Sequence, residues 1–445
     1  MENLKKYEVK CLGLDDQAQG EAYIEKGKKV LVPYLLPKEV GIIEYNKING
    51  RAKLVKVLKE NKIREIVKCP IYHKCGSCQI LHMNYNEQIN FKKELVERCL
   101  KNEKINYNIK DIITNDKIEA YRNKMQVAYR LKDNKIIYGF YEEESHRIIP
   151  LEYCLIQTKK QNEIAKTIAT IMKELKIAPY NEDKRSGVIR FALIREAIKT
   201  NQILVTIVTN GEMFPGRSEF VKRLKDRCPY INTIIQNYNS RKTSIILGDE
   251  ERVLFGNGFI EEELCGVKFK ISSKTFFQIN PYQVEKLYNK VIELANFNKD
   301  DIVIDSYCGV GTIGMIVAPY VKEVYGVETN KTSVQYAKMN ANNNRISNIH
   351  FICEDATEYL KELSKQKAKI NGLIMDPPRS GSTPIFLENI KKLKPEKVVY
   401  VSCDPHTLAR DLKMILDLYS IKNISIVDMF SGTCHVEVLT VLRRI

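Results

Sequence analysis

Short apolar strands alternate regularly with helical stretches in the C-terminal part of the chain, and this feature most constrains the fold. The strands are predicted at residues 302–304, 324–327, 350–353, 373–375 and 398–401. Repeated strand–helix units predict a mostly parallel, doubly wound α/β sheet. Ligands of such sheets bind at the carboxyl ends of the strands, so we expect a functional site at that edge.

A helix before these units and two strands after them complete the region. Asn280 is a good helix N-cap and Pro281 suits the first helical position, so a helix is predicted to begin there. Further strands are predicted at 424–427 and 436–441. We therefore expect residues 271–445 to form one Rossmann-like domain.

The rest of the chain is organised differently. Residues 1–60 contain short β-rich segments separated by glycines and no long helix, which predicts a small β-barrel. Residues 61–270 mix strands with helices predicted near 88–100 and 161–177, which indicates a central α+β domain. The helix near 88–100 is a candidate to pack against the C-terminal domain.

Composition narrows the class of protein. Of the 445 residues, 44% are hydrophobic, which excludes wholesale disorder. The start of the chain lacks the apolar core of a signal peptide, and no apolar run approaches the ~20 residues that span a bilayer, so we expect a cytoplasmic protein. The formal net charge of +16 suits a polyanionic partner such as nucleic acid, although coding bias toward lysine explains it equally well.

A glycine-rich loop follows the first strand of the alternating region. Residues 309–314 read GVGTIG, a G-x-G-x-x-G sequence between a strand and a predicted helix. Glycines let the backbone approach a ligand closely, and an acidic residue after the second strand, here Glu328, can bind ribose hydroxyls. The loop therefore predicts a nucleotide-type cofactor.

Acidic residues around this loop favour a cationic cofactor. Asp305 ends the first strand, beside the position that a pyrophosphate would need. S-adenosylmethionine carries a sulfonium and an ammonium group and no phosphate. Asp355, after the third strand, is a candidate to bind the adenine amine, or else an ordinary carboxylate at a strand end. Asp376 ends the fourth strand, and Pro377 and Pro378 would hold it rigidly beside the cofactor.

Two residues near the same edge are candidates for catalysis. Cys403 ends the fifth strand, where a thiolate could attack an electrophilic ring carbon, although most intracellular cysteines are only buried apolar residues. Glu437 lies between Val436 and Val438, an unexpected charge in an apolar strand. Burial raises the pKa of a carboxyl group, which suits a general base.

Three cysteines with C-x5-C-x2-C spacing form a candidate metal site. They are Cys69, Cys75 and Cys78, and Cys154 is the candidate fourth ligand. Four thiolates suit an iron–sulfur cluster or structural zinc. Three close cysteines with one distant partner favour the cluster over zinc, with free thiols as a third alternative. His73 and His82 are alternative zinc ligands, but we interpret them as solvated loop residues. The other cysteines, Cys403 apart, are interpreted as packing residues: Cys11, Cys99, Cys228, Cys265, Cys308, Cys353 and Cys434.

Together these segments resemble the RNA uracil-5-methyltransferase family over nearly the whole chain. The matching segments are residues 274–280 (KTFFQIN), 305–309 (DSYCG), 376–379 (DPPR), 402–405 (SCDP) and 435–437 (HVE). The N-terminal barrel resembles a TRAM domain, an OB-like RNA-binding module. The four cysteines match the [4Fe–4S] ligands of the ribosomal-RNA branch of the family. The transfer-RNA branch of some bacteria lacks both features, so the resemblance implies 23S ribosomal RNA as the substrate, with transfer RNA as the alternative.

The resemblance also implies a class I methyltransferase fold for residues 271–445 and a role for each site residue. The residues implied to bind S-adenosylmethionine are Gln278, Tyr307, Glu328 and Asp376, with Asp355 and Thr312 as further candidates. Cys403 would add to carbon 6 of uracil, and Glu437 would remove the carbon 5 proton. Ser431 departs from the family, which commonly has proline there, so we expect a less rigid loop before Glu437.

Two alternatives belong to other classes of protein. An NAD-dependent or iron–sulfur oxidoreductase would use the glycine loop and the cysteines but leave Asp376 and Cys403 without roles. A non-catalytic RNA-binding protein would use the barrel and the positive charge, and would not need Cys403. Residues 121–124 (YRNK) and 190–195 resemble family segments that contact RNA, although a solvated charged face explains each nearly as well. We expect a monomer.

Overall fold

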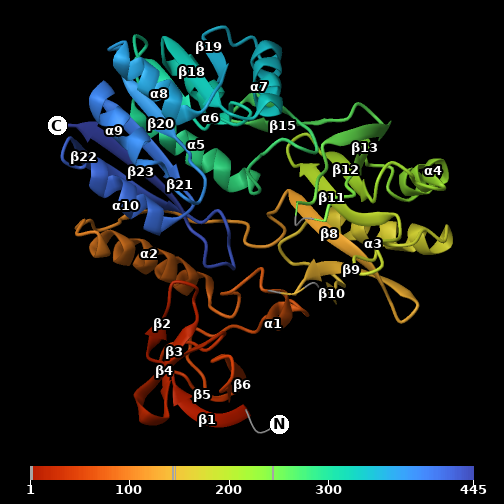
Figure 1. Cartoon of the computed structure of the whole chain (residues 1–445). Coiled ribbons are helices and arrows are strands. Elements are labelled where there is room, and N and C mark those ends of the chain that lie inside the picture. The colour runs from red at the N-terminus through yellow and green to blue at the C-terminus, as the bar shows by residue number, and fades with distance from the viewer. Residues whose placement is uncertain (1–3, 143–144, 146, 243–244) are drawn as a thin grey trace.

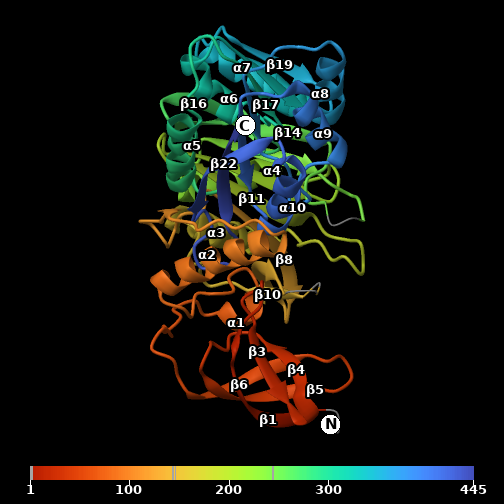
Figure 2. The ribbon, with the colours of Figure 1, turned by 90° about the vertical axis from the view of Figure 1, so that its left-hand side faces the viewer.

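The computed structural model describes residues 4–142, 145, 147–242 and 245–445. The N-terminal part lies at one end of the molecule and holds two three-stranded antiparallel sheets that pack together around Val9, Val30 and Ile43 (Figures 1 and 2). One sheet contains β1 (Leu4–Lys10), β5 (Val40–Asn46) and β6 (Ala52–Lys59). The other contains β2 (Gly13–Leu14), β3 (Gly20–Ile24) and β4 (Lys28–Val32), with the 3₁₀ turn η1 (Glu25–Gly27) between the last two.

A linking segment connects this part to the rest of the chain. It contains the short helix α1 (Tyr72–Cys75), the long helix α2 (Tyr85–Asn102) and the strand β7 (Asp111–Ile113). Asn84 caps α2 by accepting from Glu87 N. Figure 1 shows α2 running beneath α10, between the N-terminal sheets and the C-terminal domain. Phe91, Leu95 and Val96 of α2 are buried in the core of that domain.

The central part is built on one seven-stranded sheet, in the order β10-β9-β8-β11-β12-β13-β14. Its strands are β8 (Lys124–Lys132), β9 (Lys135–Tyr141), β10 (Ile148–Pro150), β11 (Ile189–Ala197), β12 (Gln202–Thr209), β13 (Thr233–Tyr238) and β14 (Glu250–Phe255). Helices α3 (Lys159–Glu174) and α4 (Arg217–Arg227) pack beside each other, with α3 against the sheet. The predicted helix at 161–177 is α3, which starts earlier because Thr158 and Gln161 form a capping box. The hairpin of β15 (Ile260–Leu264) and β16 (Val267–Ile271) follows.

The C-terminal part confirms the predicted mostly parallel sheet. Eight strands are ordered β19-β18-β17-β20-β21-β23-β22-β7, and the first five are mutually parallel. The strands are β17 (Ile302–Ser306), β18 (Glu323–Glu328), β19 (Ile349–Cys353), β20 (Gly372–Met375), β21 (Lys397–Ser402), β22 (Tyr419–Val427) and β23 (Glu437–Arg444). The eighth, β7, pairs parallel with β22, so residues 111–113 extend a sheet otherwise formed by residues 302–444.

Helices cover both faces of this sheet, as a doubly wound fold requires. They are α5 (Pro281–Ala295), α6 (Thr312–Val317), α7 (Lys331–Asn343), α8 (Ala356–Lys365), α9 (Pro384–Leu393) and α10 (Pro405–Ile415), with the 3₁₀ turn η2 (Ala318–Tyr320) after α6. Successive residues face opposite cores: Val303 packs with α5–α7, and Ile304 with α8–α10. Figure 2 shows α5 on one side of the strands and α8, α9 and α10 on the other.

Local sequence signals fix several helix starts. Asn280 caps α5 by accepting from Gln283 N, with Pro281 in the first turn, as predicted. Cys353 was expected to be a packing residue, but it is exposed because it ends the edge strand β19. In the described part of the chain, no helix has both the length and the apolar character needed to cross a membrane.

Candidate active site

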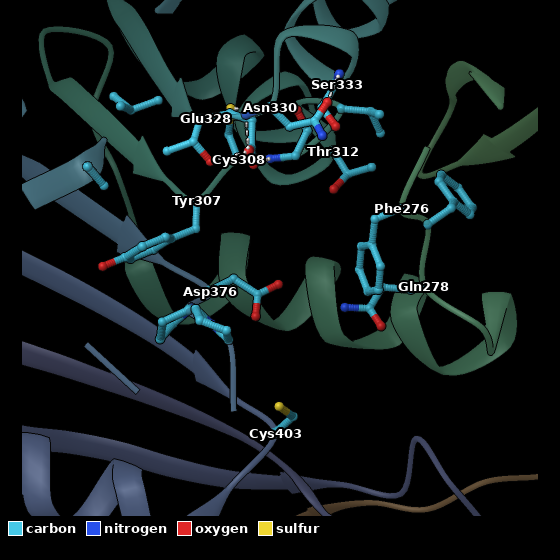
Figure 3. Close-up of a pocket in the computed structure, with 18 of the residues that line it drawn as sticks. Phe276, Gln278, Tyr307, Cys308, Thr312, Glu328, Asn330, Ser333, Asp376 and Cys403 are labelled. Atoms are coloured by element: carbon cyan, nitrogen blue, oxygen red, sulfur yellow. Dashed lines mark hydrogen bonds between the residues drawn. The ribbon is translucent and has the colours of Figure 1, made fainter. Parts of the chain in front are cut away.

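A cavity of about 750 Å³ opens at the carboxyl ends of β17, β18, β20 and β21. Every residue that the sequence singled out for cofactor binding or catalysis lines it: Gln278, Tyr307, Thr312, Glu328, Asp355, Asp376, Cys403 and Glu437. Figure 3 shows Tyr307, Asp376 and Gln278 around the cavity, with the sulfur of Cys403 below Asp376. Each of these residues comes from a different strand, helix or loop, and the sheet brings them together.

The glycine-rich loop is held by hydrogen bonds to two acidic side chains. Gly309 N donates to Glu328 Oε2 at 3.1 Å, and Gly314 N donates to Asp305 Oδ2 at 2.8 Å. Gly311 has φ +79°, and a Cβ there would lie 2.6 Å from the ring of Phe351, so only glycine fits. The loop therefore turns tightly and leaves its backbone beside the cavity.

The loop also places an aromatic residue in an unusual conformation. Tyr307 has φ +63°, in the left-handed region that residues with a Cβ rarely adopt. Its ring packs on Phe386 with centroids 5.4 Å apart, and its side chain lines the cavity. Backbone strain of this kind persists where the surrounding structure holds it, and it is frequent at ligand sites.

Three polar residues line the cavity near the ends of β17, β18 and β19. Glu328 Oε1 accepts from Asn330 N at 2.7 Å, which fixes the carboxylate at the end of β18. Thr312 begins α6, and its hydroxyl lies 3.4 Å from that of Tyr288. Asp355 caps α8 by accepting from two backbone N–H groups. Asp355 thus has a structural role as well as its place in the cavity wall.

The segment that carries Gln278 is held by the central domain. Asn123 Nδ2 donates to the carbonyl oxygen of Gln278 at 2.9 Å, and Asn123 N donates to Ile279 O at 2.8 Å. The buried guanidinium of Arg195 donates to Thr275 O at 2.7 Å. Strands β8 and β11 therefore position one wall of a cavity that belongs mainly to the C-terminal sheet.

Three carboxyl groups dominate the electrostatics of the cavity: Asp376 and Glu437 line it, and Asp305 is buried against the glycine-rich loop. Burial raises the pKa of Asp376 to about 7. Burial also raises the pKa of Asp305 to about 7, and its Oδ1 has no hydrogen-bond partner among the described residues. The pKa of Glu437 is raised well above its usual range by burial and then by Asp376, while Arg379 opposes the rise. Such a site favours protonated acids, or a cationic ligand that stabilises their charged forms.

The charged groups of the cavity also change the pKa of the Cys403 thiol. Burial raises the pKa of its thiol to about 11, the charges of Glu437 and Asp376 add to the rise, and Arg379 lowers it. Asp404, the next residue, caps α10 through His406 N and Thr407 N, which fixes the turn that presents the thiol. Cys403 is thus a nucleophile that needs a nearby base or positive charge to ionise.

The four cysteines proposed as metal ligands lie in one corner near α1. Burial raises the pKa of Cys78, and Cys154 makes the next largest contribution to that rise. Burial likewise raises the pKa of Cys154 to about 11, with smaller contributions from Cys75 and Cys69. The four sulfurs are therefore electrostatic neighbours. Within the described ranges, no group of three or more acidic, His or Cys side chains is arranged to hold a metal ion.

The prediction of a solvated His82 is wrong. Its side chain is buried, and Nδ1 lies 2.6 Å from the hydroxyl of Tyr72. Burial lowers the pKa of His82 to about 3, with Arg64 and His73 adding to the effect. Two aromatic neighbours explain the difference, since the rings of Tyr34 and Tyr72 pack against that of His82.

Sequence reasoning missed several residues of the cavity. Phe276, Tyr288, Asn330, Ser333, Arg379 and Phe430 also line it. Only Arg379 and Phe276 lie in segments that the sequence marked as motifs. Asn330 follows the acidic end of β18 and caps α7, a position that could have been recognised from the strand–helix pattern.

Comparisons with known proteins agree with this geometry. Residues 84–445 match the family described as tRNA (Uracil-5-)-methyltransferase. The chain is 38% identical to an uncharacterized RNA methyltransferase of Clostridium tetani, over 91% of this chain and 88% of that protein. It is 34% identical to one of Halalkalibacterium halodurans, over 98% and 96%.

A solved structure matches the chain almost from end to end. It is the Pyrococcus abyssi tRNA (uracil-54, C5)-methyltransferase in complex with S-adenosyl-L-homocysteine. The TM-score is 0.78 at 28% identity, and the match covers 98% of this chain and 99% of that one. The whole arrangement of parts is therefore shared with a methyltransferase structure.

The negative charge of Asp376 is expected to affect the pKa of the Cys403 thiol. We expect Asp376→Asn to lower the pKa of the thiol, because a negative charge that disfavours the thiolate is removed. The faster alkylation by iodoacetamide should emerge only above about pH 7, where Asp376 is ionised in the wild type. Peptide mass spectrometry measures alkylation of Cys403 against pH. Glu354→Gln, which removes a carboxylate of the same cavity, is the control and should leave the profile unchanged; identical profiles for all three proteins would contradict the account.

Proposed function

The chain belongs to the RNA uracil-5-methyltransferase family, and from this we propose that it methylates carbon 5 of a specific uridine through a covalent adduct with Cys403. It is an S-adenosylmethionine-dependent methyltransferase that acts on RNA. Family membership favours methyl transfer over the oxidoreductase and over the non-catalytic RNA-binding protein. The observation that carries the proposal is the meeting of Cys403, Glu437 and Asp376 in one cavity.

We assign the cofactor site to the part of the cavity that is lined by Tyr307, Thr312 and Glu328. S-adenosylmethionine supplies a methyl group on a cationic sulfonium. Glu328 is held at the end of β18 as an acceptor for ribose hydroxyls, and Tyr307, Thr312 and Asp355 line the same wall. Gln278 and Asp376 face the region between this wall and Cys403. The raised pKa values of Asp305 and Asp376 support a cationic ligand, since its charge would stabilise both carboxylates.

Cys403 activates the uracil ring. Carbon 5 of uracil is a weak nucleophile, and addition of the thiolate to carbon 6 gives an enolate with electron density on carbon 5. Covalent catalysis thereby divides one difficult step into easier ones. A base within a folded stem cannot reach Cys403 at the sheet edge, so the uridine is flipped out, at a cost of a few kcal/mol.

Glu437 completes the reaction as the general base. After methyl transfer, its carboxylate takes the proton from carbon 5, and the electron pair of that bond restores the ring double bond as the bond to Cys403 breaks. The raised pKa of Glu437 makes it a stronger base than an exposed carboxylate once it is ionised.

We assign 23S ribosomal RNA as the substrate, on the resemblance of the N-terminal sheets and of the four cysteines to the ribosomal-RNA branch. The second candidate is transfer RNA, which is favoured by the match to the P. abyssi tRNA enzyme over almost the whole chain. Arg122 and Lys124 support an RNA surface in the central domain. Lys124 is half-buried, and burial lowers its pKa to about 8, with Arg195 and Arg122 as like-charged neighbours. This concentration of positive charge suits a polyanionic partner.

The cysteine corner is proposed to hold a [4Fe–4S] cluster. A single zinc ion would draw four sulfurs to about 2.3 Å from one centre, whereas a cubane distributes its ligands over four irons and needs them farther apart. The support for one shared site is that the four cysteines contribute to one another's raised pKa values. Cys69, Cys75, Cys78 and Cys154 would be its ligands, and it would tie the linking segment to the central domain.

Methyl transfer to RNA tests the proposed reaction and substrate. With methyl-labelled S-adenosylmethionine, wild-type protein should label unmodified 23S ribosomal RNA at 5-methyluridine, and Cys403→Ala should lose activity by more than about a thousandfold. Cys353→Ala, at an exposed cysteine outside the cavity, should be unaffected. Labelling of transfer RNA alone would overturn the substrate assignment, and equal labelling by Cys403→Ala would overturn the mechanism.

Metal analysis tests the proposed cluster. Protein purified without oxygen should be brown and contain iron and acid-labile sulfide, and Cys78→Ser should lose both because one ligand is missing. Cys353→Ser serves as the matched control and should retain them. A colourless wild-type protein with stoichiometric zinc would reject the cluster.

A further inference from the structure

The hairpin between β22 and β23 contains one residue of the catalytic cavity, Phe430, and is followed directly by another, Glu437. It spans residues 428–436 and leads directly into Glu437. Phe430 and Glu437 both line the cavity with Cys403. Val427 pairs with Glu437 across the hairpin, so a shift of residues 428–436 would be passed to the carboxylate of Glu437.

A buried ion pair holds the start of this hairpin. Lys92 Nζ of α2 lies 2.5 Å from Asp428 Oδ1, and the two side chains are 0% and 1% exposed. The same ammonium donates to the carbonyl oxygen of Phe430 at 3.0 Å. One lysine from the linking segment therefore binds two residues of the hairpin, one of which lines the cavity.

Further hydrogen bonds complete the arrangement around Asp428. Its Oδ2 accepts from the hydroxyls of Tyr85, at 2.9 Å, and Ser431, at 2.5 Å. Asn115 Nδ2 donates to Ser431 Oγ at 2.8 Å, and the hydroxyl of Tyr121 donates to Ser431 O at 3.0 Å. Ser431, where the family commonly has proline, is thus fixed by hydrogen bonds, and the expectation of a looser loop finds no support in its contacts.

The rest of the hairpin backbone is held in the same way from two sides. Its other side-chain partners are Gln88 with Gly432 N, Gln79 with Cys434 N, Asn280 with Met429 O, and Gln283 with Asp428 O. Gln79 and Gln88 belong to the linking segment, whereas Asn280 and Gln283 belong to the start of α5. The hairpin is therefore clamped between two separate regions of the chain.

A buried ion pair of this kind is a poor source of stability, because desolvation of both charges offsets their attraction. What such a pair can contribute instead is a specific geometry. We propose that Lys92 is a positioning residue for Glu437: through Asp428 and Phe430 O it fixes the hairpin so that the carboxylate of Glu437 meets the proton on carbon 5. This proposal rests on the proposed function of Glu437 and Cys403.

The proposal separates two stages of one reaction. Addition of Cys403 and methyl transfer do not use Glu437, whereas release of product needs the carbon 5 proton to move to its carboxylate. As that proton leaves, its electron pair forms the carbon 5–carbon 6 double bond and Cys403 departs as a thiolate. A displaced Glu437 slows release alone, so the methylated protein–RNA adduct accumulates.

The experiment measures this adduct with unmodified RNA and S-adenosylmethionine. Lys92→Met should raise the ratio of denaturation-resistant methylated adduct to released product at least about tenfold, the effect of about 1.4 kcal/mol on one step. Tyr85→Phe keeps the ion pair but removes one hydrogen bond to Asp428, and should give a smaller rise in the same direction. Lys93→Met changes a neighbouring, partly exposed lysine of α2 and should leave the ratio at the wild-type value.

The outcomes distinguish this proposal from the proposed function. Glu437→Gln should accumulate the adduct strongly; if it does not, the role of Glu437 fails. If Glu437→Gln accumulates adduct while Tyr85→Phe and Lys92→Met lower adduct and product in parallel, Lys92 only stabilises the fold and the positioning role is rejected. Should Lys92→Met fail to fold, an unchanged ratio in a folded Tyr85→Phe protein would also reject it.

Discussion

Three carboxyl groups and a thiol gather at one edge of a parallel sheet, with Asp305 and Glu437 buried and Asp376 and Cys403 partly buried, and this electrostatic constraint shapes the whole site. Asp305 lies near the end of β17, Asp376 and Cys403 directly follow β20 and β21, and Glu437 begins the antiparallel strand β23. Burial raises all four pKa values, and the charge of Asp376 adds to the rise at Asp305, Cys403 and Glu437. A cationic sulfonium between these groups would relieve the repulsion, which is why the proposed cofactor and the proposed nucleophile suit the same cavity.

The regions outside the C-terminal sheet hold that edge in place. Asn123 and Arg195 of the central domain bind the backbone around Gln278. Lys92 of α2 binds the hairpin before Glu437 from the opposite side. The N-terminal and central parts are therefore positioned to do more than bind RNA, since the cavity walls depend on contacts from the central domain and the linking segment.

Local patterns in the sequence predicted the parallel sheet, the start of α5 and five cavity residues, Glu328, Asp355, Asp376, Cys403 and Glu437. They could do so because strand ends, caps and glycine turns are set by a few neighbouring residues. Gln278, Tyr307 and Thr312 came from the family resemblance alone. The role of each cavity residue came from the family resemblance and stays a proposal. The sequence did not reveal β7, since a three-residue strand pairs with β22 more than three hundred residues away. The burial of His82 and the pairing of Lys92 with Asp428 are likewise non-local. One signal was present: Lys92 lies on the apolar face of α2, between Ile89 and Leu95.

Identification of the covalent intermediate tests the central claim most directly. RNA containing 5-fluorouridine replaces the carbon 5 proton with fluorine, which Glu437 cannot remove, so the adduct should persist after methyl transfer. Digestion and mass spectrometry should then find one nucleotide with a transferred methyl group attached to the peptide that contains Cys403. Attachment to Cys308, the other thiol that lines the cavity, or methylation of RNA without any adduct, would contradict the account.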